Sequence, residues 1–82
     1  MTINDKINVE IKTLVSRVRL LETSIASQRA ALITLATDGS VTDIMTFGGG
    51  YIEQISKYQH EIYVCMEKRE MLEYIQNEID TE

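Results

Sequence analysis

The chain has no proline, and no glycine lies between Ile3 and Ala36, so nothing in this stretch interrupts a helix. Thr2 and Asp5 have the spacing of an N-terminal capping box, and Asp5 also suits the positive end of a helix dipole. Apolar residues then recur in alternating steps of four and three, at Ile7, Ile11, Leu14, Val18, Leu21, Ile25, Leu32 and Leu35, with Gln28 as the only polar member. This heptad spacing predicts a helix over residues 3–36, roughly 50 Å long.

A second heptad pattern predicts a helix over residues 51–80. Its seam positions are Ile55, Tyr58, Ile62, Cys65, Leu72 and Ile79, with Arg69 and Gln76 in the two remaining places. Two helices of similar length favour an antiparallel hairpin, with Leu32 near Ile55 at one end and Ile7 near Ile79 at the other. The expected fold is therefore an all-α antiparallel helical hairpin with coiled-coil seams.

The 82 residues make one domain, residues 1–82, with a small core. A chain of this size buries only about 60–65% of its unfolded surface, so a lone core is marginal. The single cysteine, Cys65, excludes an intrachain disulfide. Together with His60, the only histidine, it cannot supply the four ligands of a structural zinc site. Self-association or docking onto a partner is the remaining way to complete the core.

The pattern of the first helix, mostly β-branched at position a and leucine at position d, is also typical of a parallel two-stranded coiled coil. The two geometries coexist if hairpins associate into a four-helix or larger bundle. Apolar residues outside the seams favour such a homo-oligomer: Val9, Val15, Leu20, Ile33, Val64, Met66, Met71 and Ile75. We therefore expect the chain to bind itself, in an arrangement that the sequence leaves open.

Residues 37–50 break the heptad pattern and are expected to form a loop. Ser40 and Asp43 have the spacing to cap one short helical turn, and a strand over 41–47 is an alternative. The three glycines at 48–50 favour a hinge before the second helix. A loop of this length is unusual between two helices and often carries function.

The apolar residues of this loop, Ile44, Met45 and Phe47, have two interpretations. They fill the open end of the bundle, or they bind a partner protein. Together with Leu20 and Ile33 on the outer face of the first helix, they are the candidate partner-binding residues.

Four of the eight basic residues, Arg17, Arg19, Lys68 and Arg69, come close together in the expected hairpin. They form ion pairs with neighbouring glutamates or hold a small anionic ligand such as a nucleotide. The first interpretation is the simpler, because glutamates surround all four positions.

The net charge of −5 and the pI near 4.8 disfavour a nucleic-acid partner. No segment reaches the ~20 apolar residues of a membrane span, so no membrane association is expected. No arrangement of residues typical of catalysis stands out, and we expect neither an enzyme nor a cofactor or metal. The polar N-terminus lacks the apolar run of a signal peptide, which predicts a cytoplasmic protein.

The pairs Thr2-Ile3, Lys6-Ile7, Glu10-Ile11, Thr13-Leu14 and Ser16-Arg17 resemble the start of the small tail-fibre assembly chaperones of T-even bacteriophages. The resemblance covers residues 2–17. It implies an N-terminal coiled coil, a turn and a second helical segment, in a protein that helps phage fibre proteins fold and trimerise in the host cytoplasm without catalysis or a cofactor. The triple glycine and the longer second helix depart from that family.

Tyr74 and Glu78 resemble the export tail of the small secreted helical hairpins of the WXG family. That family carries Trp-x-Gly in its turn, where this chain has Phe47-Gly48-Gly49. The expected function is that of a non-enzymatic protein–protein interaction module: an assembly factor, adaptor or inhibitor. A binder of a small anion and a WXG-like hairpin are the alternatives.

Overall fold

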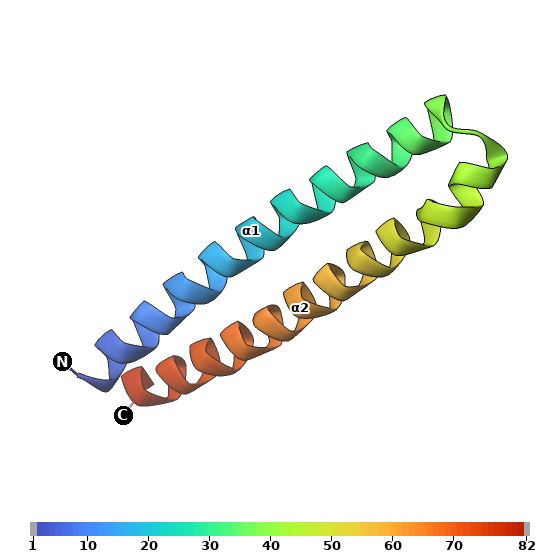
Figure 1. Cartoon of the computed structure of the whole chain (residues 1–82). Coiled ribbons are helices and arrows are strands. Elements are labelled where there is room, and N and C mark those ends of the chain that lie inside the picture. Colours follow the sequence, from blue (N-terminus) through green and yellow to red (C-terminus); the bar gives the residue numbers. More distant parts are fainter. Residues whose placement is uncertain (1, 82) are drawn as a thin grey trace.

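The computed structural model describes residues 2–81, which form two long helices, α1 (Ile3–Asp38) and α2 (Val41–Thr81). The helices lie side by side and run in opposite directions, so that the two ends of the chain meet at one end of the rod (Figure 1). The hairpin measures 62 × 15 × 14 Å. The described part of the chain has no strand, and the predicted all-α antiparallel hairpin is confirmed.

The capping box predicted for α1 is present. The Asp5 backbone N–H donates to Thr2 Oγ1 at 3.2 Å, and the Thr2 backbone N–H donates to Asp5 Oδ2 at 3.0 Å. These reciprocal bonds satisfy backbone donors that have no partner within the first helical turn. They set the first residue of α1 and leave its seam positions aligned with α2.

The core of the hairpin is a single line of seam residues. The buried hydrophobic residues of the described chain are Ile7, Leu14, Leu21 and Ile25, all of them predicted seam positions. The seam residues of α2 are only half-buried. α2 thus covers the seam of α1, while the flanks of both helices remain exposed to solvent.

Two side-chain hydrogen bonds fix the register at the open end. Asn4 Nδ2 donates to Asp80 Oδ1 at 3.0 Å, and Gln76 Nε2 donates to Asn8 Oδ1 at 2.6 Å. These bonds bracket Ile7 and set it at the level predicted from the two seams, close to Ile79.

The prediction of a loop over residues 37–50 is wrong, as is the strand alternative over 41–47. α1 continues to Asp38, and α2 begins at Val41, so that only Gly39 and Ser40 connect the helices. At this end Leu32 lies beside Gly48, about two helical turns closer to the connection than Ile55, its predicted neighbour.

Local capping and packing explain the longer second helix. The Asp43 backbone N–H donates to Ser40 Oγ at 3.1 Å, and the Ser40 backbone N–H donates to Asp43 Oδ2 at 3.2 Å. The predicted cap therefore starts the whole of α2 and not a single turn. Glycine lowers helix stability by about 1 kcal/mol per residue but does not prohibit a helix. Gly48 is buried against α1, and tertiary packing of this kind outweighs propensity.

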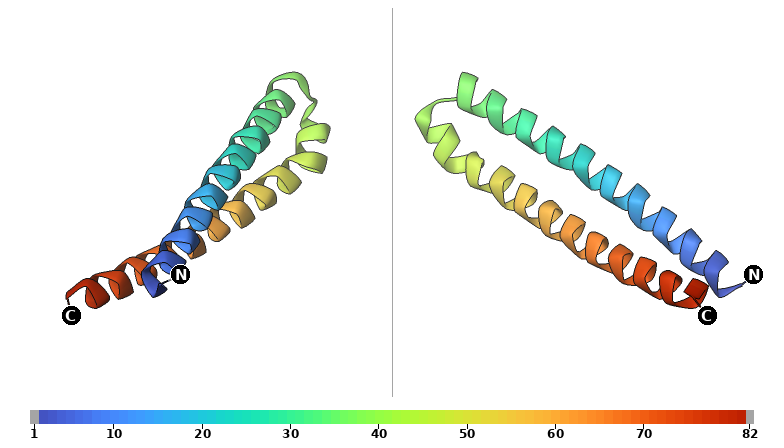
Figure 2. Two further views of the ribbon diagram at one scale, coloured as in Figure 1. Left: turned by 90° about the vertical axis from the view of Figure 1, so that its left-hand side faces the viewer. Right: turned by 180° about the vertical axis from the view of Figure 1, so that it is seen from behind.

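α2 changes direction close to the connection, in its lime-coloured first turns (Figures 1 and 2). Gly48, Gly49 and Gly50 lie in this part of the helix, and none of them has a positive φ. Glycine pairs are a common cause of helix bends. The first turns of α2 thus lie beside the last turns of α1, next to the connection (Figure 1).

Candidate functional site

Charged residues are unevenly distributed along the hairpin. Of 8 basic and 13 acidic residues, only Arg29, Asp38 and Asp43 lie between residues 23 and 52. This segment, here called the tip half, holds 30 of the 82 residues and contains the connection. The other half carries nearly all of the charge and therefore most of the strongly hydrated surface.

Large apolar side chains are exposed in the tip half. They are Ile33 (65% exposed), Val41 (72%), Met45 (80%), Phe47 (58%) and Ile52 (59%), here called the tip patch. Spacings of four and seven residues place Val41, Met45 and Ile52 on one stripe of α2. The centres of protein–protein interfaces are poor in charge and rich in aromatic residues and methionine, and the tip patch shares that composition.

The three apolar residues predicted as a unit have different environments. Ile44 is half-buried and lies one turn before Gly48 on the face of α2 that meets Leu32 of α1, so it lies on the inner side of the hairpin. Met45 and Phe47 are exposed. Ile44 thus matches the end-filling interpretation, whereas the other two side chains are open to a partner.

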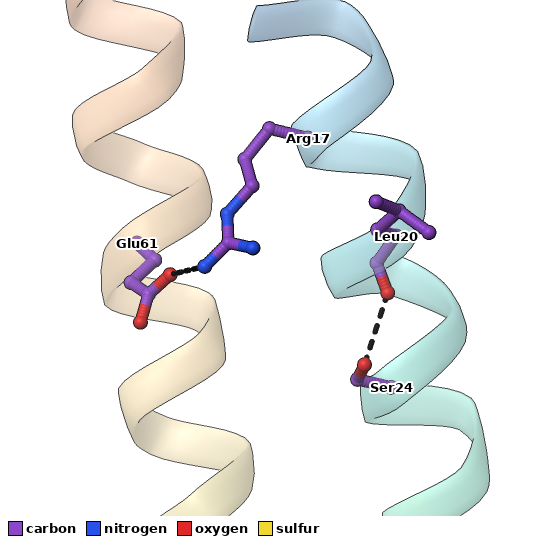
Figure 3. A network of polar contacts seen from close by, with 4 residues as sticks. All are labelled: Arg17, Leu20, Ser24 and Glu61. Atoms are coloured by element: carbon purple, nitrogen blue, oxygen red, sulfur yellow. Dashed lines mark hydrogen bonds and ion pairs between the residues drawn. The ribbon is translucent and has the colours of Figure 1, made fainter.

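The remaining candidate partner-binding residues lie apart from one another. Ile33 belongs to the tip patch, while Leu20 lies in the charged half, 63% exposed on the outer face of α1. Leu20 and Val9 line a shallow depression of about 460 Å³. The Leu20 carbonyl accepts a hydrogen bond from Ser24 Oγ at 3.0 Å (Figure 3).

Sequence reasoning missed Val41 and Ile52 as members of the patch. Val41 lies inside the segment predicted to be a loop, where no face can be assigned to a side chain, and Ile52 lies just after that segment. Once residues 41–52 are known to be helical, their spacing from Met45 identifies them.

Two of the four clustered cations form ion pairs. Arg17 Nη2 contacts Glu61 Oε2 at 2.8 Å across the two helices (Figure 3), and Arg69 Nε contacts Glu73 Oε1 at 2.8 Å within α2. Both pairs are about half-exposed. Each is therefore worth about 0–1 kcal/mol.

A groove in the charged half, here called the mid-groove, lies between the helices and has a volume of about 310 Å³. Its walls are Leu14, Val15, Val18, Arg19 and Glu22 of α1 and Cys65, Met66 and Arg69 of α2. Arg17 lines the separate depression beside Leu20, and Lys68 lines neither hollow. The four predicted anion-binding residues therefore do not converge on one pocket, although Arg19 and Arg69 do.

The Phe47-Gly48-Gly49 stretch, expected in a turn by the WXG comparison, lies inside α2. Within residues 2–81, no group of three or more His, Cys, Asp or Glu side chains is placed to hold a metal ion. No helix of the described chain has a stretch long and apolar enough to cross a membrane.

Comparisons with protein-family models, with curated proteins and with solved structures give no match to this chain.

Proposed function

We propose that this hairpin is a non-enzymatic protein–protein interaction module, an assembly factor, adaptor or inhibitor, that binds another protein through the tip patch. Exposed large apolar side chains occur along the whole hairpin, and the observation that carries the proposal is that those of the tip patch stand in a segment with only three charged residues. Exposed large apolar side chains gathered in one segment of a small protein are typical of an interaction site.

The magnitudes agree with a partner that engages the whole patch. Burying one large apolar side chain contributes about 1.5–3 kcal/mol, so the five side chains of the tip patch together contribute about 8–15 kcal/mol. Association itself costs about 4–15 kcal/mol. A partner with a groove that surrounds the end of the hairpin is therefore needed for stable binding, because contact with one flank alone does not offset that cost.

The sharpest form of the proposal is a phage tail-fibre assembly chaperone, as the resemblance of residues 2–17 implies. Such a protein works by contact with assembling chains and needs no cofactor. An exposed apolar tip on a stiff rod suits that task, since assembling fibre chains expose apolar segments that are covered later. In this form the protein acts in the cytoplasm of the infected host.

Affinity capture from the native or infected-cell lysate, read by mass spectrometry, tests the tip patch. The double variant Met45→Ser/Phe47→Ser removes the most exposed side chain of the tip patch and its one aromatic residue. The matched control is Met71→Ser/Tyr74→Ser, which removes a methionine and an aromatic residue of similar exposure from the charged half. One stoichiometric partner, retained by the control and lost by the tip variant, is the expected result. Equal capture by both variants would place the binding surface elsewhere.

A second candidate function is binding of a small anion, such as a nucleotide, in the mid-groove. Arg19 and Arg69 favour it, while the Glu22 carboxylate in the same groove and the Arg69–Glu73 ion pair oppose it. A ligand present at a hundred times its dissociation constant stabilises the folded state by about 2.7 kcal/mol. A thermal-shift panel of nucleotides and phosphorylated metabolites tests this function. A shift that disappears in Arg69→Gln would favour it over the tip-patch proposal.

A further inference from the structure

The hairpin exposes more surface than a compact protein of its mass. Its accessible surface is 6198 Å² at 9.4 kDa, whereas the scaling for folded monomeric proteins gives about 5,000 Å². The excess of about 1,200 Å² exceeds the ~800 Å² that each partner buries in a stable protein–protein interface. One flank of the rod is thus large enough to pack against another molecule of similar shape.

The mid-groove has the chemistry of a surface that pairs with itself. Its floor is apolar, and Met66 stands at its edge with half of its surface exposed. Arg19 and Glu22, three residues apart on the rim, have no ion pair with any residue of the described chain. A twofold axis that passes between these two residues brings the same patch of two copies together and sets Arg19 of each copy opposite Glu22 of the other.

The charge distribution selects the direction of pairing. Residues 67–82 hold six acidic residues against Lys68 and Arg69. In a parallel pair these acidic segments lie side by side and repel each other. In an antiparallel pair each lies beside the tip half of the other copy, which carries only three charged residues.

We propose that a second copy of this chain docks antiparallel on the face that carries the mid-groove, with Met66 of each copy in the groove of the other. The product is a four-helix bundle whose two tip patches lie at opposite ends. The dimer forms whether or not the tip patches bind a partner, and it offers two equivalent partner sites that face away from each other.

Sedimentation equilibrium measures the mass. The expected result is twice the 9.4 kDa of one chain. Met66→Lys places a charge in the dimer interface at a position that is 50% exposed in the single hairpin, so the variant is expected to be a helical monomer. Met71→Lys, at 56% exposure and outside the mid-groove, is the matched control and is expected to remain dimeric. A monomeric wild-type chain, or a Met66→Lys variant that stays dimeric, would overturn the proposal.

Charge exchange tests the contacts across the axis. Arg19→Glu alone and Glu22→Arg alone each place like charges opposite one another and are expected to weaken the dimer at least fivefold. The double variant Arg19→Glu/Glu22→Arg restores the opposite signs and is expected to recover the wild-type dissociation constant. A double variant weaker than either single one would contradict the reciprocal pairing.

Two measurements on the folded protein do not depend on how Met66→Lys folds. Cys65 lines the mid-groove, so a short bismaleimide is expected to join two wild-type chains. The direction of docking is measured with a spin label on Thr42→Cys in a Cys65→Ser background, because the distance between the labels of the two copies gives the separation of their tips. Val18 of the groove is twenty residues from the end of α1, about 30 Å, so antiparallel tips lie about 60 Å apart. A distance far below this value, as expected when the tips lie side by side on helices whose axes are about 8–10 Å apart, would show parallel docking and refute the proposal.

Discussion

The three glycines inside α2 allow a sharp test of the fold, because no packing in the hairpin requires two of them. A Cβ built at Gly49 or at Gly50 meets nothing within 4 Å, and neither residue has a positive φ. Alanine is more stable than glycine in a helix interior by about 0.8–1.0 kcal/mol. The double variant Gly49→Ala/Gly50→Ala is therefore expected to be about 2 kcal/mol more stable than the wild type.

Thermal unfolding followed by circular dichroism at 222 nm measures this gain. A chain of 82 residues has an unfolding entropy of about 170 cal/mol/K, so 2 kcal/mol raises Tm by roughly 12 °C. All variants are compared at one protein concentration, since self-association makes Tm depend on concentration. A rise much below this value would show that the solution helix does not run through residues 49 and 50.

Gly39→Ala is the control with the opposite expected sign. Its Cβ would lie 2.5 Å from the Leu35 carbonyl oxygen and 3.1 Å from Leu35 Cδ1. The clash is with backbone, and that oxygen also accepts the Gly39 N–H at 2.8 Å, so the connection has to shift. We expect a loss of about 1–3 kcal/mol. If alanine stabilises position 39 as much as positions 49 and 50, the chain does not turn at Gly39 and the two-residue connection is incorrect.

Three further substitutions test the seam, the second cap and the inter-helix ion pair. Leu21→Asp buries an unpaired charge at a position only 3% exposed and is expected to unfold the hairpin, whereas Leu20→Asp, at 63% exposure, retains the far-ultraviolet helix signal. Ser40→Ala removes the side-chain acceptor at the start of α2 and lowers the free energy of unfolding by about 1 kcal/mol in urea titrations, and Ser40→Asp restores most of it. Glu61→Gln breaks the half-exposed ion pair with Arg17 and lowers the free energy of unfolding by less than about 1 kcal/mol at low salt, and by less still in 1 M NaCl. A larger or salt-independent loss would contradict the assignment of this contact as a screened surface ion pair.

The heptad spacing predicted the core because burial between two helices depends on periodicity alone. Ile7, Leu14, Leu21 and Ile25 recur at the interval that keeps one stripe facing a neighbour, and these are the residues that the structure buries. These positions are buried by any antiparallel helix that presents an apolar stripe of its own. The core could therefore be predicted without further knowledge of α2.

The connection was not predictable by the same reasoning. Three consecutive glycines have a low helix propensity, so residues 48–50 were predicted to be non-helical. Whether they are helical depends on tertiary contacts that sequence spacing does not reveal. Gly48 is buried beside Leu32, and the cap at Ser40 starts a helix that the packed residues beyond Gly50 continue. The error carried over to the site, because Val41 and Ile52 gain a common face with Met45 only when this segment is helical. Met45 and Phe47 were identifiable from sequence because they are large apolar residues in a charge-poor stretch.

The weakest helical segment of the hairpin coincides with the tip patch, and amide hydrogen exchange can detect this. Three helical glycines lower the stability of α2 around Gly48–Gly50 by about 2.4–3 kcal/mol relative to alanine. Residues 41–47 are attached to the rest of α2 only through that stretch, so their local opening is easier than global unfolding. A difference of about 2.4–3 kcal/mol corresponds to exchange roughly 50–150 times faster over 41–50 than over 55–70 in the wild type.

Gly49→Ala/Gly50→Ala is expected to remove most of that difference without adding a contact. Uniform protection along α2 in the wild type would show instead that packing of the tip against α1 compensates fully for the glycines.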